Sequence, residues 1–315
     1  MTVAVVLLAY AVCVGTLGTR LLGRARWTVR DPLLAIVTYL AAAWSVVAAL
    51  GLAGLTLAVH ATALGGGLSQ LVGACVRRLR DTYATPGGAA AAGIGLTLAG
   101  AVVAHAMVTS VTHLLAVRRQ ALRHVQAARL IGHLEPALGA MLVDHAQPAA
   151  YCVAGPHPTV IMTSGALQAL DADQVDAVLA HERAHLARHH HRLLAVARIG
   201  GQMLPFVPLM RDTVAQVTRL VEMHADDTAT SDRDNRTLAT ALVVLATAVS
   251  PAPALAAGAT DTVQRIQRLL GPAEPLSRGR RHLLRAEAAV LALTPVLIAL
   301  APAVLALALG RVPAA

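Results

Sequence analysis

Two histidines and a glutamate in one short stretch have the types and spacing for metal-assisted hydrolysis. Residues 178–191 read V-L-A-H-E-R-A-H-L-A-R-H-H-H. His181 and His185 are four residues apart, so on an α-helix both imidazoles lie on one face and can bind a single metal ion. Glu182 stands between them, where a carboxylate can accept a proton from a water molecule bound to Zn²⁺. The pattern predicts a zinc site with His181 and His185 as ligands and Glu182 as catalytic base.

The alternative for this stretch is a histidine-rich helix exposed to solvent. The chain has 315 residues, 14 histidines and five glutamates, and a chance H-E-x-x-H occurs in roughly one such chain in a hundred. The metal-binding interpretation is therefore the stronger one.

A catalytic zinc site needs a third protein ligand, and two candidates follow the motif. His191 lies six residues after His185, as in H-E-x-x-H-x-x-G-x-x-H, but Arg188 stands where that pattern has the glycine that turns the chain. Glu222, in V-E-M-H-A-D-D-T-A, is the better candidate. Asp226, four residues later, shares its helix face and can accept the free N–H of a ligand histidine. We therefore predict Glu222 as the third ligand and Asp226 as the residue that orients a ligand histidine.

Other polar residues near these motifs are given no chemical role. Asp227, His224 and the run 189–191 are expected to be solvated surface groups. A donor to the developing oxyanion is also expected, and either Arg265 or a histidine can supply it. The three cysteines form no CxxC pair and are interpreted as isolated apolar side chains: Cys13, Cys75 and Cys152.

The composition points to a membrane protein. The chain is 56% hydrophobic and 14% charged, with a mean hydropathy of +0.62. The net charge is +9, but aromatic residues make up only 2% and the basic residues gather beside apolar runs, so we expect no direct nucleic-acid binding. All 26 basic residues are arginine, which excludes a Walker A loop, a Schiff-base lysine and a Ser-x-x-Lys acylation site.

Four apolar runs are long enough to cross a bilayer: 1–19, 33–59, 91–117 and 286–309. Arginines are dense after the first and third runs and before the fourth, which by the positive-inside rule places these flanks in the cytoplasm. We therefore expect an extracytoplasmic loop at 60–90 and a cytoplasmic metallopeptidase domain at 118–282. Three arginines in the 60–90 loop oppose this orientation.

A small sheet is expected just before the metal-binding helix. Residues 133–140 resemble a helix end, whereas 141–143, 149–154 and 159–163 resemble short strands. The edge of such a sheet can pair with an extended peptide. Asp171 as N-cap and Gln174 three residues later form a capping box that predicts the start of the metal-binding helix.

Two further apolar runs are shorter or interrupted. Residues 193–210 contain two glycines and two prolines, which favours a helix on the protease core or at the membrane surface over a further crossing. Residues 238–249 are expected to form a core helix because the run is too short to cross.

Five motifs carry a resemblance to a known family: P-A-A-Y-C-V-A-G, V-I-M-T-S-G-A-L, V-L-A-H-E-R-A-H, E-M-H-A-D-D-T-A and R-I-Q-R-L-L, all within residues 144–270. The chain resembles the integral-membrane zinc peptidases typified by the BlaR/MecR sensor-transducers, which are related more distantly to HtpX and the CAAX prenyl proteases. The resemblance implies a cytoplasm-facing gluzincin that holds Zn²⁺ through His181, His185 and Glu222. It also implies a repressor as substrate, with a winged-helix repressor as the expected partner.

The chain departs from the best-known members of that group. From the end of the sequence at Ala315 we expect no external penicillin-binding sensor domain, and the 315 residues contain no lysine for the acylation motif of such a domain. We expect a multi-pass membrane zinc endopeptidase acting on a protein or peptide. Two alternatives are a housekeeping or prenyl-protein processing protease, and a signalling scaffold whose zinc is structural, with His189 or His224 as fourth ligand.

Overall fold

The chain is mostly helical, with one small sheet near the middle of the sequence. The computed structural model describes residues 2–58, 88–155, 157–248, 256–272 and 274–308. In chain order the elements are α1 (Thr2–Gly23), η1 (Arg26–Val29), α2 (Pro32–Ala58), α4 (Gly88–Ile131), β1 (Gly132–Glu135), β2 (Ala140–Val143), β3 (Ala150–Val153), β4 (Thr159–Thr163), α5 (Ser164–Ala169), α6 (Ala172–Ala187), α7 (His190–Met203), α8 (Pro208–Ala229), α9 (Asn235–Ala248), α10 (Ala256–Leu270) and α11 (Arg278–Ala308). The prediction of a mainly helical chain with a small sheet is confirmed.

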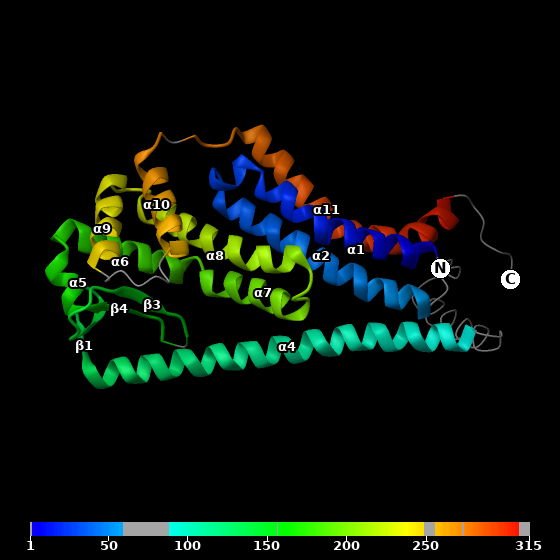
Figure 1. Cartoon of the computed structure of the whole chain (residues 1–315), viewed down its shortest axis with the longest axis horizontal. Coiled ribbons are helices and arrows are strands. Elements are labelled where there is room, and N and C mark those ends of the chain that lie inside the picture. The colour runs from blue at the N-terminus through cyan, green and yellow to red at the C-terminus, as the bar shows by residue number, and fades with distance from the viewer. Residues whose placement is uncertain (1, 59–87, 156, 249–255, 273, 309–315) are drawn as a thin grey trace.

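The molecule is elongated, and its two ends differ (Figure 1). Helices α1, α2 and α11 lie together toward the end that carries both termini. The sheet lies at the opposite end with α5, α6, α9 and α10. Helix α4 runs along the length of the molecule and joins the two ends.

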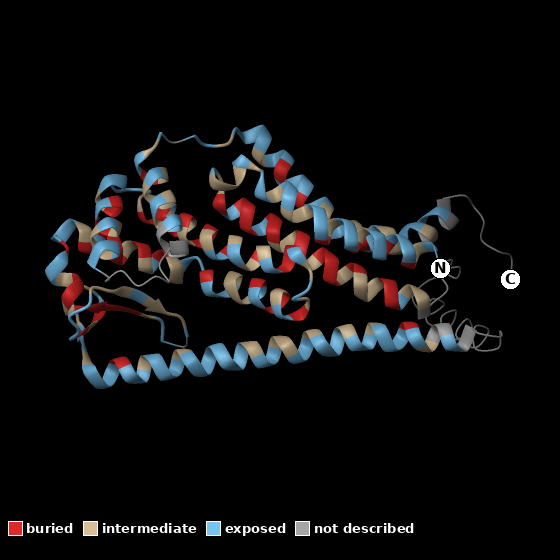
Figure 2. Cartoon of the chain, in the orientation of Figure 1, coloured by how far each residue is buried: buried red, intermediate tan, exposed pale blue. Residues whose placement is uncertain are grey.

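Four helices are long and apolar enough to cross a membrane: Thr2–Gly23, Pro32–Leu57, Gly93–Ile131 and Arg278–Pro302. They contain most of the four apolar runs found in the sequence. The run 91–117 lies inside a helix that continues through the following arginines to Ile131. Helix α4 is exposed along most of its length (Figure 2), so its apolar side chains face outward. The expected loop at 60–90 lies almost entirely outside the described residues.

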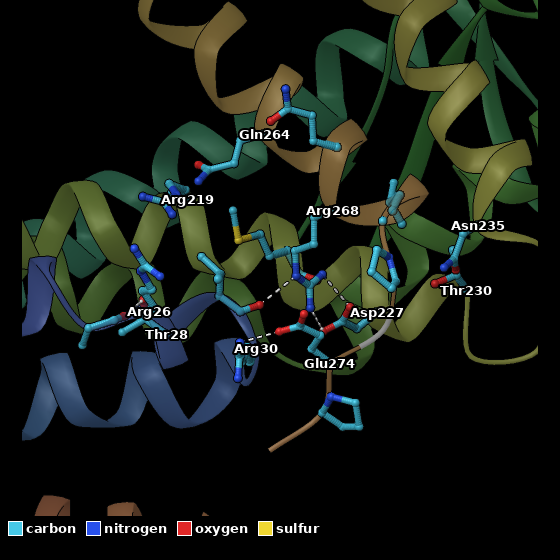
Figure 3. Close-up of a pocket in the computed structure, with 18 of the residues that line it drawn as sticks. Arg26, Thr28, Arg30, Arg219, Asp227, Thr230, Asn235, Gln264, Arg268 and Glu274 are labelled. Carbon is cyan, nitrogen blue, oxygen red and sulfur yellow. Dashed lines mark hydrogen bonds and ion pairs between the residues drawn. The ribbon is translucent and has the colours of Figure 1, made fainter. Parts of the chain in front are cut away.

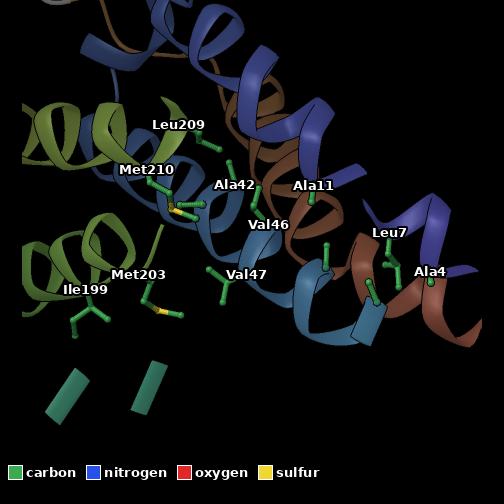
Figure 4. Close-up of a cluster of buried hydrophobic side chains, with 13 residues drawn as sticks. Ala4, Leu7, Ala11, Ala42, Val46, Val47, Ile199, Met203, Leu209 and Met210 are labelled. Atoms are coloured by element: carbon green, nitrogen blue, oxygen red, sulfur yellow. The ribbon is translucent and has the colours of Figure 1, made fainter. Parts of the chain in front are cut away.

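A buried apolar cluster joins the candidate spans to the rest of the protein (Figure 4). Leu7 of α1 and Val46 of α2 belong to the same cluster as Met203 of α7 and Met210 of α8. A second cluster packs α2 against the middle of α8, with Tyr39 almost fully buried. The first half of α8 is therefore packed against the apolar helices, and this packing fixes the position of its later residues, which include Glu222 and Asp226.

The sheet has the strand order β1-β2-β4-β3, in which β2 and β4 are parallel and the other pairs antiparallel. The predicted strands at 141–143, 149–154 and 159–163 are confirmed, and three of their six ends are shifted by one residue. The predicted helix end at 133–140 is wrong, because residues 132–135 pair with β2. Helix α4 stops where Gly132 packs closely: a Cβ there would lie 2.6 Å from the carbonyl oxygen of Leu142.

Helix α6 begins as predicted. The side chain of Asp171 accepts from the backbone N–H of Gln174, and the Gln174 side chain accepts from that of Asp171. Val175, Val178 and Leu179 then bury one face of α6 against the sheet. This packing fixes the face that carries the histidines.

The two interrupted apolar runs form packed helices. Residues 193–210 are divided between α7 and α8, with Pro208 in the first turn of α8. Ile199 and Met203 are buried in the cluster that α7 shares with α1, α2 and α8, which agrees with a packed helix either on the protease core or at the membrane surface. Residues 238–248 belong to α9, whose Leu238 is fully buried, so the prediction of a core helix is also confirmed.

Candidate metal centre

Three side chains from two helices converge on one point. His181 and His185 come from one face of α6, and Glu222 comes from α8, which packs against it. The Nε2 atoms of the two histidines are 3.1 Å apart. Oε2 of Glu222 lies 3.5 Å from Nε2 of His181, and Oε1 lies 3.5 Å from Nε2 of His185.

This geometry fits a small divalent cation. Ligand atoms about 2.0–2.2 Å from a tetrahedral zinc ion are roughly 3.3–3.6 Å from one another. The three donor atoms here lie within 4.8 Å of one another, and the nearest contacts are close to the tetrahedral separation. Two imidazole nitrogens and a carboxylate oxygen are also a donor set that zinc prefers.

Asp226 lies beside His181 on the side away from this convergence point. Its Oδ1 atom is 3.0 Å from Nδ1 of His181, although the direction is not that of a regular hydrogen bond. Asp226 is only 1% exposed. A buried carboxylate at this position favours the tautomer of His181 that carries its proton on Nδ1 and turns the Nε2 lone pair toward the metal position.

Arg265 of α10 joins the two carboxylates. Its Nε donates to Oδ2 of Asp226 at 2.9 Å, and its Nη2 donates to Oδ1 at 2.7 Å. Its Nη1 lies 3.0 Å from Oε2 of Glu222. The sequence suggested Arg265 only as an oxyanion donor without a position; the structure puts its guanidinium at the edge of the site.

The two carboxylates are held in their charged form. Burial alone would raise the pKa of Glu222, but its contact with His181 and the charge of Arg265 outweigh burial and lower the pKa to about 2. Burial also acts to raise the pKa of Asp226, but the hydrogen bonds from Arg265 and the close contact with His181 outweigh it and lower the pKa to about 2. The site therefore offers negative charge to a cation at neutral pH.

Glu182 has the environment of a general base. Burial raises its pKa above the ordinary value, although the nearby charge of His181 opposes this. A carboxylate with a raised pKa takes up a proton more readily near neutral pH. The thiol of Cys152, on β3, contacts Glu182, and burial followed by the charge of Glu182 raises the pKa of that thiol to about 12. Cys152 is therefore not an isolated filler.

The prediction that all of 189–191 is solvated surface is wrong for His190, which is 1% exposed. Its Nδ1 atom lies 2.9 Å from Nδ1 of His185, and its Nε2 atom lies 2.8 Å from Nδ1 of His224. The chain reverses between α6 and α7 at His189, which has a left-handed backbone with φ 53°. This reversal brings His190 back against the preceding helix.

The remaining predicted surface groups differ from one another. His191 is exposed and takes no part in the cluster of donor atoms, so the structure does not place it as the third ligand. Neither His189 nor His224 belongs to that cluster among the described residues. Asp227 is half-exposed and forms a bidentate ion pair with Arg268, at 2.6 and 2.7 Å.

Comparison with known families agrees with the site. Residues 115–273 match the sequence model of peptidase family M48, and this range covers half of the chain and every residue of the metal centre. The chain belongs to peptidase family M48, which points to a zinc metallopeptidase. Searches of curated proteins and of solved structures gave no match.

Proposed function

We propose that the chain is a membrane-embedded zinc endopeptidase. The observation that supports this best is the convergence of Nε2 of His181, Nε2 of His185 and a carboxylate oxygen of Glu222 within 4.8 Å. These three atoms leave a fourth position of a tetrahedral ion free for water, as in catalytic zinc sites. A zinc ion held there would acidify its bound water and polarise a peptide carbonyl.

The residues around this position divide the remaining tasks. Glu182 accepts a proton from the attacking water and returns it to the leaving amine. Asp226 fixes the orientation of His181, and Arg265 fixes Asp226 and Glu222 through its three contacts. Arg265 is also the candidate to donate to the oxyanion, because its Nη2 atom lies 3.4 Å from Nε2 of His181.

We infer that the substrate is an extended peptide segment that pairs with β3. This strand is at the edge of the sheet and pairs with β4 on its other side. Cys152 of β3 contacts Glu182, so a segment added along this edge runs past the catalytic carboxylate. Backbone hydrogen bonds then supply binding that depends little on side chains.

The membrane part of the proposal rests on the four long apolar helices. Their outward apolar surface on α4 and α11 has no other partner among the described residues. Arginines at the start of α11 and in the later part of α4 favour a cytoplasmic position for the sheet and α6.

The family match is equally compatible with signalling and with housekeeping proteolysis. We propose the narrower role, cleavage of a transcriptional repressor, from the resemblance of the five sequence motifs to the BlaR/MecR sensor-transducers. This role can be tested by quantitative proteomics that compares cells with the wild-type chain and cells with Glu182→Gln. A single DNA-binding protein that accumulates in the Glu182→Gln cells supports the role, and many accumulated membrane proteins contradict it.

Purified full-length chain in mild detergent provides the test of the chemistry. We expect cleavage of an unfolded protein substrate to stop with a chelator and return with Zn²⁺. Glu182→Gln should keep one equivalent of zinc and lose cleavage, whereas Glu222→Ala should lose both. Full activity of Glu182→Gln would overturn the assigned base, and a zinc ion with four protein ligands would indicate a structural site.

A further inference from the structure

A cavity separate from the metal centre lies between η1, α8 and α10 (Figure 3). Its volume is about 770 Å³, which is within the range of small-molecule sites, about 300–1,000 Å³. None of the proposed zinc ligands lines it, nor do Glu182, Asp226 or Arg265. The metal site therefore does not account for it.

Positive charge dominates the lining. Five arginines and two carboxylates take part: Arg24, Arg26, Arg30, Arg219, Arg268, Asp227 and Glu274. Each of the two carboxylates forms an ion pair with an arginine of the same lining, Asp227 with Arg268 and Glu274 with Arg30. Arg24, Arg26 and Arg219 have no carboxylate partner among the described residues.

Arg219 is the most informative of these three. It lies on α8, and its Nε atom is buried without a hydrogen-bond partner in the described part of the chain. Among the described residues, the hydrogen bond that its side chain makes is a long one, from Nη1 to Oε1 of Gln216 at 3.4 Å. Buried donors in folded proteins are nearly always paired with protein or water, so this guanidinium nitrogen beside a cavity is available to an acceptor that enters it.

The donors that line this cavity suit a ligand with several acceptor oxygens. Arg26 and Arg219 lie on the same side of the pocket as Gln264, away from the two ion pairs (Figure 3). A guanidinium fork matches the oxygens of phosphate bidentately, and the Gln264 amide can add a further donor. The cavity is large for a bare ion, and apolar side chains such as Met223 and Leu269 also line it.

We propose that this cavity binds a phosphate-bearing small molecule, with Arg26 and Arg219 on the phosphate group. The cavity lies where α1 ends and the chain turns into α2, both of them candidate spans. A phospholipid headgroup at the membrane surface is therefore one source of the phosphate, and a free phosphate compound is the other.

Calorimetric titration of the full-length chain in a neutral maltoside detergent tests the proposal. The probes are dihexanoyl phosphatidic acid, inorganic phosphate at matched ionic strength, and dihexanoylglycerol as a ligand without phosphate. We expect saturable binding of phosphatidic acid or phosphate and none of dihexanoylglycerol. Arg219→Gln and Arg26→Gln should each weaken binding roughly tenfold, the size of one charge-assisted contact.

Arg280→Gln is the matched control, because Arg280 is exposed at the start of α11 and does not line the cavity. It removes the same charge and should change affinity less than twofold. Tighter binding of phosphatidic acid than of phosphate assigns the lipid source, and equal binding assigns the free compound. Absence of saturable binding, equal binding of dihexanoylglycerol, or equal weakening by Arg280→Gln would overturn the proposal. Arg26 is exposed, so Arg26→Gln keeps the test valid if Arg219→Gln does not fold.

Discussion

The Nδ1 atom of His190 lies 2.9 Å from the Nδ1 atom of His185, on the side of that imidazole opposite to its contacts with His181 and Glu222. Outer partners of this kind usually are carboxylates or carbonyl oxygens, and here a buried histidine takes the place. Burial, followed by the charges of His185 and His224, lowers the pKa of His190 to about 3, so its ring is neutral and can accept as well as donate.

We predict that His190→Ala lowers zinc affinity about 10- to 100-fold, the usual effect of removing an outer partner of a ligand histidine. A competition titration with a chromophoric chelator measures this affinity. His190→Asn keeps a polar group near His185 and should recover part of the loss. His191→Ala is the control, since His191 is exposed. An affinity equal to wild type in His190→Ala would show that the contact only packs the helices.

A second prediction concerns the buried pair of Asp226 and Arg265, whose side chains are 1% and 11% exposed. Arg265→Gln leaves Asp226 charged in a buried position, so it should reduce the free energy of unfolding by about 3–5 kcal/mol. Asp226→Asn combined with Arg265→Gln removes both charges and should cost less than Arg265→Gln alone. Denaturant titration of chelator-treated protein measures both.

The free energy of unfolding is measured on zinc-free protein, because a variant that also lost zinc would be destabilised for a second reason. Arg233→Gln provides a control, because the side-chain hydrogen bond that Arg233 makes within the described part of the chain is weak, at 3.5 Å to the carbonyl oxygen of Ala229. If the double variant were less stable than Arg265→Gln, the destabilisation would come from lost packing and not from the unpaired carboxylate.

The sequence was sufficient for the parts of the site that depend on local spacing. His181 and His185 share a face because helical geometry alone places residues four apart together. The capping box at Asp171 is equally local, and it set the beginning of α6 correctly. Glu222 and Asp226 were grouped for the same reason, although only the packing of α8 on α6 brings them to the histidines.

The missed features all depend on the path of the chain between elements. The contact of His190 with His185 requires a left-handed residue at His189, which its residue type did not indicate. The only local signal was the run of three histidines directly after the helix. The position of Arg265 depends on how α10 packs on α8, and β1 is a strand because it pairs with β2.

Cys152 allows a prediction about reactivity. Burial, with the charge of Glu182, raises the pKa of this thiol to about 12, so the reactive thiolate is scarce at pH 8. Alkylation by iodoacetamide should be roughly a thousandfold slower than for a free cysteine.

Glu182→Gln removes the negative charge beside Cys152, which is the second cause of the raised pKa, and should speed the alkylation several-fold while burial still protects the thiol. Mass spectrometry of a variant whose other cysteines are alanine measures the rate. Labelling at the rate of a free thiol would contradict the burial of Cys152, and an unchanged rate in Glu182→Gln would contradict its contact with Glu182.

Gly165 tests how firmly the loop before β3 is held. A Cβ at Gly165 would lie 2.2 Å from the carbonyl oxygen of Ala146, which no side-chain rotation can relieve. The loop cannot easily move away, because Thr163 donates to the carbonyl oxygen of Gln147 at 2.9 Å and accepts from the backbone N–H of Ala149 at 2.9 Å. We predict that Gly165→Ala reduces the free energy of unfolding by at least about 1–3 kcal/mol.

The same change should separate zinc binding from cleavage. The ligands come from α6 and α8, so zinc affinity should stay close to wild type. The displaced loop leads directly into β3, the proposed substrate strand, so the rate of peptide cleavage should fall. Gly155→Ala is the matched control, because a Cβ at Gly155 meets no heavy atom within 4 Å. Wild-type cleavage by a destabilised Gly165→Ala protein would argue that the substrate does not bind along β3.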